Sequence, residues 1–194
     1  TDRVDAPWTV IDPYDGNFRN ASVARAIIAA VEAAVAVKRQ NAVPVAPTKA
    51  SEEEIGQISA LDAIDLSRTC ERGVYKKELA ELQSELYDLT YKAYKKDISS
   101  TILFEGWDAA GKGGAIRRLT AGIDARITRV IPVSAPTDEE LAHNYLWRFW
   151  RHIPRAGFVT IYDRSWYGRV LVERVEKLTQ PEDWKRAYAE LNDF

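Results

Sequence analysis

The sequence contains no methionine, one cysteine and two histidines among its 194 residues. The lone Cys70 has no second cysteine with which to form an internal disulfide, so a reducing cytoplasm is the expected compartment. His143 and His152 lie nine residues apart without a cysteine companion, which makes them weak candidates for metal ligands. Because position 1 is not methionine, we expect the chain to be an excised or processed segment whose ends are artificial.

Long apolar runs and a strong net charge are also missing. No run reaches the roughly 20 residues that span a membrane, and the N-terminal region lacks the pattern of a signal peptide. The formal net charge is −2 and hydrophobic residues make up 46% of the chain, as in a globular protein rather than a basic nucleic-acid binder. We therefore expect neither a membrane nor a specific nucleic acid as a partner, and the oligomeric state, a homo-oligomer included, stays open.

The first part of the chain divides into segments of different composition. Residues 1–40 have the pattern of a strand followed by an alanine-rich helix over about 20–38. Residues 41–51 combine prolines with small residues, as linkers do. The strongest helical signal, apolar residues spaced by four and three, covers 73–96. We therefore expect a linker at 41–51 that separates the end of one module from a second module over 52–194.

Short apolar runs alternate with helical patterns in this second module. Residues 101–104, 127–133 and 158–163 are rich in β-branched or aromatic side chains, which predicts strands. A capping-box pattern opens a helix expected over 139–152, and another is expected to begin at Pro181. Strands that alternate with helices predict an α/β fold with a parallel sheet between helices.

The segment after the first of these strands has the glycine and lysine spacing of a phosphate-binding loop. It reads Gly-Trp-Asp-Ala-Ala-Gly-Lys-Gly-Gly over 106–114. Glycines let backbone N–H groups converge on an anion, the following helix adds the positive end of its dipole, and the lysine reaches the terminal phosphates. The predicted phosphate ligands in the loop are Gly106, Ala109, Ala110, Gly111, Lys112, Gly113 and Gly114. The alternative is a glycine-rich turn without a ligand.

Two aspartates are candidates for a Mg²⁺ site. Most such loops place a Ser or Thr hydroxyl on the metal directly after the lysine, where this sequence has Gly113. Asp108 in the loop and Asp163 at the end of a predicted strand offer carboxylates instead. Ligands gather at the carboxyl ends of parallel strands, so both aspartates are expected beside the same phosphate. The alternatives are a solvated Asp108 and an Asp163 that only caps the next turn.

A resemblance to polyphosphate kinase family 2, a group of P-loop phosphotransferases that use inorganic polyphosphate, rests on three motifs. They are Phe-Glu-Gly-Trp-Asp-Ala-Ala-Gly-Lys-Gly-Gly-Ala-Ile at 104–116, His-Asn-Tyr-Leu-Trp-Arg at 143–148 and Asp-Arg-Ser-Trp-Tyr-Gly-Arg at 163–169. The resemblance implies a P-loop kinase-like three-layer fold, here truncated at the C-terminus before the helical lid. It implies catalytic roles for Asp108, Lys112, Asp163 and Arg164, with Mg²⁺ on the two aspartates and phosphate on Arg117, Arg118 and Arg169.

The N-terminal residues carry a further resemblance. Residues 5–11 (Asp-Ala-Pro-Trp-Thr-Val-Ile) with Arg25 are similar to the end of one such module, which implies a tandem arrangement of two modules. Tandem members of the family resemble enzymes that transfer the terminal phosphoryl group of polyphosphate to AMP and produce ADP. The alternatives are a kinase that uses ADP or GDP as the acceptor, and a non-catalytic module that binds nucleotide or polyphosphate.

Overall fold

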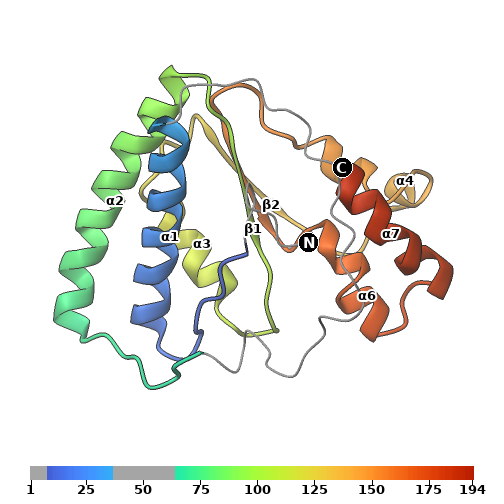
Figure 1. Cartoon of the computed structure of the whole chain (residues 1–194), viewed down its shortest axis with the longest axis horizontal. Helices are drawn as coiled ribbons and strands as arrows, with labels where there is room; N and C mark the ends of the chain where they lie inside the picture. The colour runs from blue at the N-terminus through green and yellow to red at the C-terminus, as the bar shows by residue number, and fades with distance from the viewer. Residues whose placement is uncertain (1–7, 37–63) are drawn as a thin grey trace.

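A parallel sheet forms the centre of the computed structural model, which describes residues 8–36 and 64–194 (Figure 1). Its three strands, β1 (Ser100–Phe104), β2 (Thr128–Pro132) and β3 (Val159–Asp163), lie in the order β1-β3-β2. The central strand β3 pairs in parallel with both neighbours, and all of its residues except Asp163 are buried. A parallel strand covered on both faces has to be apolar, which explains the apolar run at 158–163. The α/β fold with a parallel sheet is confirmed.

Three helices cover one face of this sheet (Figure 1): α1 (Gly16–Ala36), α2 (Arg72–Lys95) and α3 (Lys112–Thr120). Their apolar stripes meet in one core cluster that includes Ile28 of α1, Leu86 of α2, Leu119 of α3 and Ile161 of β3. Leu86 and Ile161 have no exposed surface at all. The helix predicted over 73–96 from its periodicity is therefore confirmed, and its stripe serves packing.

Short helices and aromatic side chains form the layer on the other face (Figure 1): α4 (Asp138–Leu141), α5 (Trp147–Trp150), the 3₁₀ turn η2 (Trp166–Arg169), α6 (Val172–Val175) and α7 (Pro181–Asp193). Tyr162 of β3 is fully buried there, and its hydroxyl donates to the carbonyl of Phe149 at 3.0 Å. The ring of Trp166 packs edge-on against Tyr162, with 5.4 Å between the ring centroids. Helices on both faces make the fold three-layered, as expected.

The single helix expected over 139–152 is wrong. The capping box of Thr137 and Glu140 is present, but the helix that it opens, α4, ends at Leu141, and α5 begins only at Trp147. Between them the Asn144 side chain accepts the backbone N–H of Leu146 at 2.9 Å. An asparagine that bonds to the backbone two residues ahead competes with the helical hydrogen bond, which explains the interruption.

The start of α1 also differs from expectation. The helix begins at Gly16 because the carboxylate of Asp15 accepts the backbone N–H of Phe18 at 2.6 Å, as an N-cap does. Residues 8–13 form no strand. The predicted linker at 41–51 lies outside the described residues. The assignment of α1 to a preceding module stays a prediction, although the helix packs on α2 and α3 in the same core. No helix in the described ranges is both long and apolar enough to cross a membrane.

Candidate phosphate-binding site

The glycine-rich segment connects the end of β1 to the start of α3, in the strand-loop-helix order that phosphate-binding loops have. Its backbone enters the left-handed half of conformational space at Gly106 (φ 155°), Ala109 (φ 60°) and Gly111 (φ 89°). Glycine adopts such angles without strain, which explains two of the three positions, whereas Ala109 is held there by its surroundings. The local sequence therefore folds into a tight loop that ends at the first turn of a helix.

Several carbonyl groups of the loop accept hydrogen bonds from within the loop and from α3. The Lys112 ammonium donates to the carbonyls of Gly106 and Trp107, each at 2.9 Å. The N–H of Ala110 also donates to the Trp107 carbonyl, at 3.3 Å, and the N–H of Ala115 donates to the Gly111 carbonyl at 3.0 Å. These hydrogen bonds fix the path of the loop backbone. They also hold the Lys112 ammonium against the loop.

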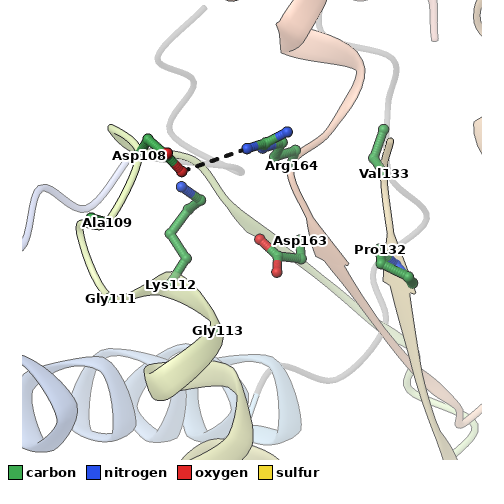
Figure 2. Close-up of a pocket in the computed structure, with 9 residues that line it drawn as sticks. All are labelled: Asp108, Ala109, Gly111, Lys112, Gly113, Pro132, Val133, Asp163 and Arg164. Atoms are coloured by element: carbon green, nitrogen blue, oxygen red, sulfur yellow. Dashed lines mark ion pairs between the residues drawn. The ribbon is translucent and has the colours of Figure 1, made fainter. Parts of the chain in front are cut away.

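A cavity of about 320 Å³ opens beside this loop (Figure 2). Its lining brings together seven residues that the sequence predicted for the site and two that it did not, Pro132 and Val133 at the end of β2. The predicted residues in the lining are Asp108, Ala109, Gly111, Lys112, Gly113, Asp163 and Arg164. The missed pair follows from the sheet order, because the register aligns Pro132 with Asp163.

The two candidate metal ligands reach this cavity from different elements. Asp163 stands at the carboxyl end of β3, paired in register with Phe104 at the end of β1. The side chain of Asp108 extends from the loop, is 99% exposed, and forms an ion pair with Arg164 at 3.9 Å. In Figure 2 the ammonium of Lys112 points toward Asp108, and both carboxylates lie around the same space. The tertiary structure thus places the two acids and the two bases around one cavity.

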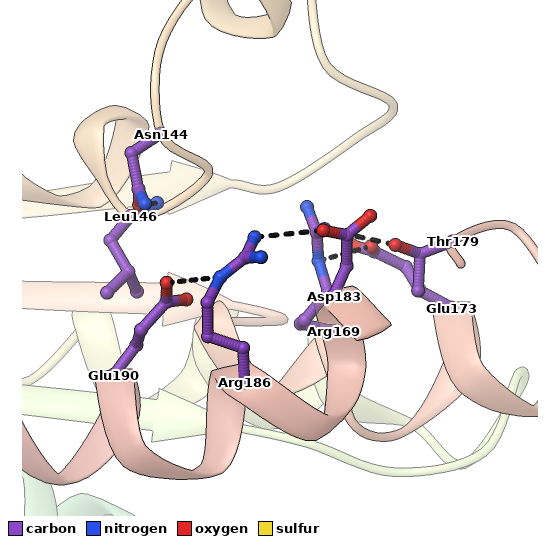
Figure 3. A network of polar contacts seen from close by, with 8 residues as sticks. All are labelled: Asn144, Leu146, Arg169, Glu173, Thr179, Asp183, Arg186 and Glu190. Carbon is purple, nitrogen blue, oxygen red and sulfur yellow. Dashed lines mark hydrogen bonds and ion pairs between the residues drawn. The ribbon is translucent and has the colours of Figure 1, made fainter. Parts of the chain in front are cut away.

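Three arginines that the resemblance implied for phosphate binding are not part of this lining. Arg117 is exposed on α3, and the Arg118 guanidinium donates to the Gly114 carbonyl at 2.9 Å. Arg169 belongs to a network with α6 and the segment before α7 (Figure 3), where it pairs with Glu173 at 2.8 Å and donates to Thr179 at 3.1 Å. In this conformation the Arg118 side chain serves a contact within α3, and the Arg169 side chain connects η2 to α6 and to the segment before α7.

Glu105 is a residue of the site region that the sequence analysis missed. Its carboxylate accepts the backbone N–H of Ser165 at 2.7 Å and the Ser165 hydroxyl at 2.6 Å. Burial raises the pKa of Glu105 above its usual value, although these hydrogen bonds and the nearby charges of Lys112 and Arg164 oppose that rise. Arg164 itself has φ 67°, an angle that a residue with a side chain adopts only when its neighbours hold it there. The Glu105 contact ties the turn that carries Arg164 to the phosphate loop.

The sheet order, the loop between β1 and α3 and the acidic end of β3 define a P-loop kinase-like protein. Comparison with known proteins agrees, since residues 69–194 match the family "Polyphosphate kinase 2 (PPK2)". The chain belongs to the polyphosphate kinase 2 family.

Some relatives match this chain over its whole length, and others match only part of it. The polyphosphate:AMP phosphotransferase of Pseudomonas aeruginosa is 46% identical over all of this chain and 39% of its own length. The ADP-polyphosphate phosphotransferase 3 of Rhizobium meliloti is 47% identical over 58% of this chain and 40% of its own length. A crystal structure of polyphosphate kinase 2 from Arthrobacter aurescens superposes with a TM-score of 0.64 at 30% identity, over 72% of this chain and 53% of that one. The chain thus spans about two fifths of the curated relatives it matches.

Proposed function

We propose that the gene product containing this chain is a Mg²⁺-dependent phosphotransferase that moves the terminal phosphoryl group of inorganic polyphosphate to AMP, giving ADP. The observation that carries the proposal is the cavity that gathers Lys112, Arg164 and two carboxylates around a loop of the phosphate-binding type. The similarity along the whole chain to a relative named for polyphosphate and AMP supports the choice of donor and acceptor.

In the proposed reaction the chain positions phosphates and neutralises their charge. The bond from the terminal phosphorus to the bridging oxygen of polyphosphate breaks, and a new bond forms to a phosphate oxygen of AMP. Backbone N–H groups of the loop and the N-terminus of α3 face the donor phosphates. The Lys112 ammonium has three N–H donors, and the carbonyls of Gly106 and Trp107 take two of them, so one remains for a phosphate oxygen. Arg164 supplies a second positive charge to the cavity, where charge spreads over the transferred group.

Asp108 and Asp163 would hold the Mg²⁺ ion. The donor set fits this ion, because Mg²⁺ commonly takes one or two carboxylates and completes its shell with phosphate oxygens and water. Within the residues described, no group of three or more His, Cys, Asp or Glu side chains is placed to hold a metal ion. The proposal therefore requires substrate phosphates as the remaining ligands. When bound, the ion would neutralise the part of the negative phosphate charge that Lys112 and Arg164 do not balance.

A kinase that uses ADP as the acceptor is the second candidate. It is favoured by one specific observation, the 47% identity over 58% of this chain to a relative named for ADP. The two candidates share the donor site and differ only in the length of the acceptor.

The test is turnover by the purified complete gene product with polyphosphate and Mg²⁺, with AMP, ADP or GDP offered separately. Phosphorus NMR or separation of the nucleotides then identifies the product. Faster formation of ADP from AMP than of triphosphate from either diphosphate supports the proposal. Preference for a diphosphate selects the second candidate. Binding of polyphosphate without turnover of any nucleotide contradicts both and identifies a non-catalytic binding module.

A further inference from the structure

Arg19 of α1 reaches the phosphate loop from a helix that lies outside the family-matched residues 69–194. Its Nη1 atom donates to the Ala110 carbonyl at 3.2 Å, across 91 positions of sequence. The other loop carbonyls with partners named above are satisfied from within the loop and α3, so Arg19 brings a contact from a separate element. Neither the motifs nor the local spacing of the loop indicates this contact.

The guanidinium also lies directly against Gly111. A Cβ atom built on Gly111 would stand 2.1 Å from Arg19 Nη1 and 2.3 Å from its Cζ, far closer than any real contact. The φ of 89° favours glycine at position 111, and a side chain there would also displace the Arg19 guanidinium. The Arg19 guanidinium packs closely on the loop because position 111 has no side chain.

The Arg19 side chain is itself held in place. Its Nε and Nη2 atoms both donate to the Asn20 side-chain carbonyl at 3.4 Å, and its Nη1 also donates to the Pro13 carbonyl at 3.4 Å. Asn20 is buried, and its amide donates to the Tyr75 hydroxyl of α2 at 3.2 Å. A chain of hydrogen bonds thus connects the loop through Arg19 and Asn20 to the core helices.

We propose that Arg19 is a positioning residue of the phosphate loop, supplied by α1, which orients the Ala110–Gly111 peptide for phosphate binding. In a planar trans peptide the C=O and N–H groups point in opposite directions, so fixing the Ala110 carbonyl toward Arg19 directs the Gly111 N–H away from it. Gly111 lines the cavity, and loops of this type bind phosphate through such N–H groups. This inference rests on the proposed polyphosphate-dependent function.

Three variants of the complete gene product test it. Arg19→Ala removes the contact, and Arg19→Lys keeps the positive charge with its N–H donors on a single nitrogen. Arg25→Ala is the matched control, because Arg25 is exposed on the same helix and pairs with Glu78 of α2. The measurements are kcat and KM for polyphosphate, the dissociation constant of inorganic triphosphate by calorimetry, and thermal melting.

We expect Arg19→Ala to lower kcat/KM for polyphosphate by about tenfold or more, since a small displacement of a positioned group costs one to two orders of magnitude. Triphosphate binding should weaken in parallel, Arg19→Lys should recover part of both losses, and Arg25→Ala should match the wild type. A role only in docking α1 would lower the melting temperature and leave kcat and KM of the folded protein unchanged, which would overturn the proposal.

A second comparison tests the contact itself. Gly111→Ala introduces a methyl group at the position of the guanidinium, so Arg19→Ala should add no further loss of triphosphate binding in the Gly111→Ala background. Independent, additive losses would show that the two residues do not act together. If the wild type binds triphosphate but transfers no phosphoryl group, the proposed function fails, while the triphosphate affinities still decide the role of Arg19.

Discussion

The Oε1 atom of Glu105 accepts both the backbone N–H and the hydroxyl of Ser165, at 2.7 and 2.6 Å. This pair joins the residue after β1 to the turn after β3, and Ser165 is only 3% exposed. Arg164, the residue directly before Ser165, lines the cavity together with Lys112 and Asp163. The geometry of the cavity therefore depends on a contact between two segments that are 60 residues apart.

Glu105→Ala should lower the rate of phosphoryl transfer by about tenfold or more, because the turn that carries Arg164 loses its hold on the phosphate loop. Glu105→Gln keeps a side-chain carbonyl for both Ser165 donors and should retain most of the activity. Steady-state kinetics of the two variants, compared with the wild type, provide the measurement. Equal loss in both variants would point to the negative charge of Glu105 rather than to its hydrogen bonds.

The raised pKa of Glu105 predicts a pH dependence of stability. A carboxyl whose pKa is higher in the folded state than the usual 4.5 binds its proton more tightly when folded, so its contribution is present below that value and lost as pH rises through the folded pKa. Glu105→Gln does not titrate. Relative to the wild type, its melting temperature should therefore increase as pH rises through this range, and a constant difference would contradict the burial effect.

Lys112→Ala should abolish most of the turnover while leaving the fold intact. Within the part of the chain that the structure describes, the ammonium hydrogen-bonds to two loop carbonyls and takes no part in the core, and loss of one charged donor at a phosphoryl-transfer site costs on the order of 10²–10³ in rate. Circular dichroism and thermal melting report folding, and Lys76→Ala, at an exposed position of α2, serves as the control. Wild-type rates in Lys112→Ala would exclude the loop as the phosphate site.

Asp108→Asn and Asp163→Asn should each raise the Mg²⁺ concentration needed for half-maximal rate and lower the maximal rate. Each substitution keeps the size of the side chain and removes one of the two charges at the cavity. The double variant should be little worse than either single one, as expected for groups that act as a unit. Titration of activity with Mg²⁺ decides the matter, and unchanged Mg²⁺ dependence in both single variants would place the metal elsewhere.

Leu86→Ala should destabilise the protein by roughly 2–5 kcal/mol, because the side chain has no exposed surface and its loss leaves a cavity between the helices and the sheet. Denaturant unfolding measures the change. Glu85→Ala, at the exposed neighbouring position, should remain close to the wild type. Similar unfolding of both variants would mean that the helical stripe does not form the core.

Much of the fold follows from local sequence. The periodicity over 73–96, the apolar run that became β3 and the capping box of Thr137 and Glu140 each depend on residues close together in the chain, and each is present. The interruption at Asn144 was missed because a short-range side-chain bond there competes with a helix that apolar spacing alone favours. The phosphate-binding loop was also recognisable from local sequence, since its glycines and lysine lie within one short segment.

The amino-acid sequence by itself determined the strand-loop-helix with Lys112 and the two aspartates, because backbone freedom, helix signals and charge are encoded locally. Only the tertiary structure decided which of these side chains meet. The pairing of β3 between β1 and β2 brings Asp163 to the loop, and the packing of α1 on α2 and α3 places Arg19 on Ala110. Such contacts between distant segments arise from burial of apolar faces. The spacing of neighbouring residues shows that an element has an apolar face, but it does not show which other element will cover that face.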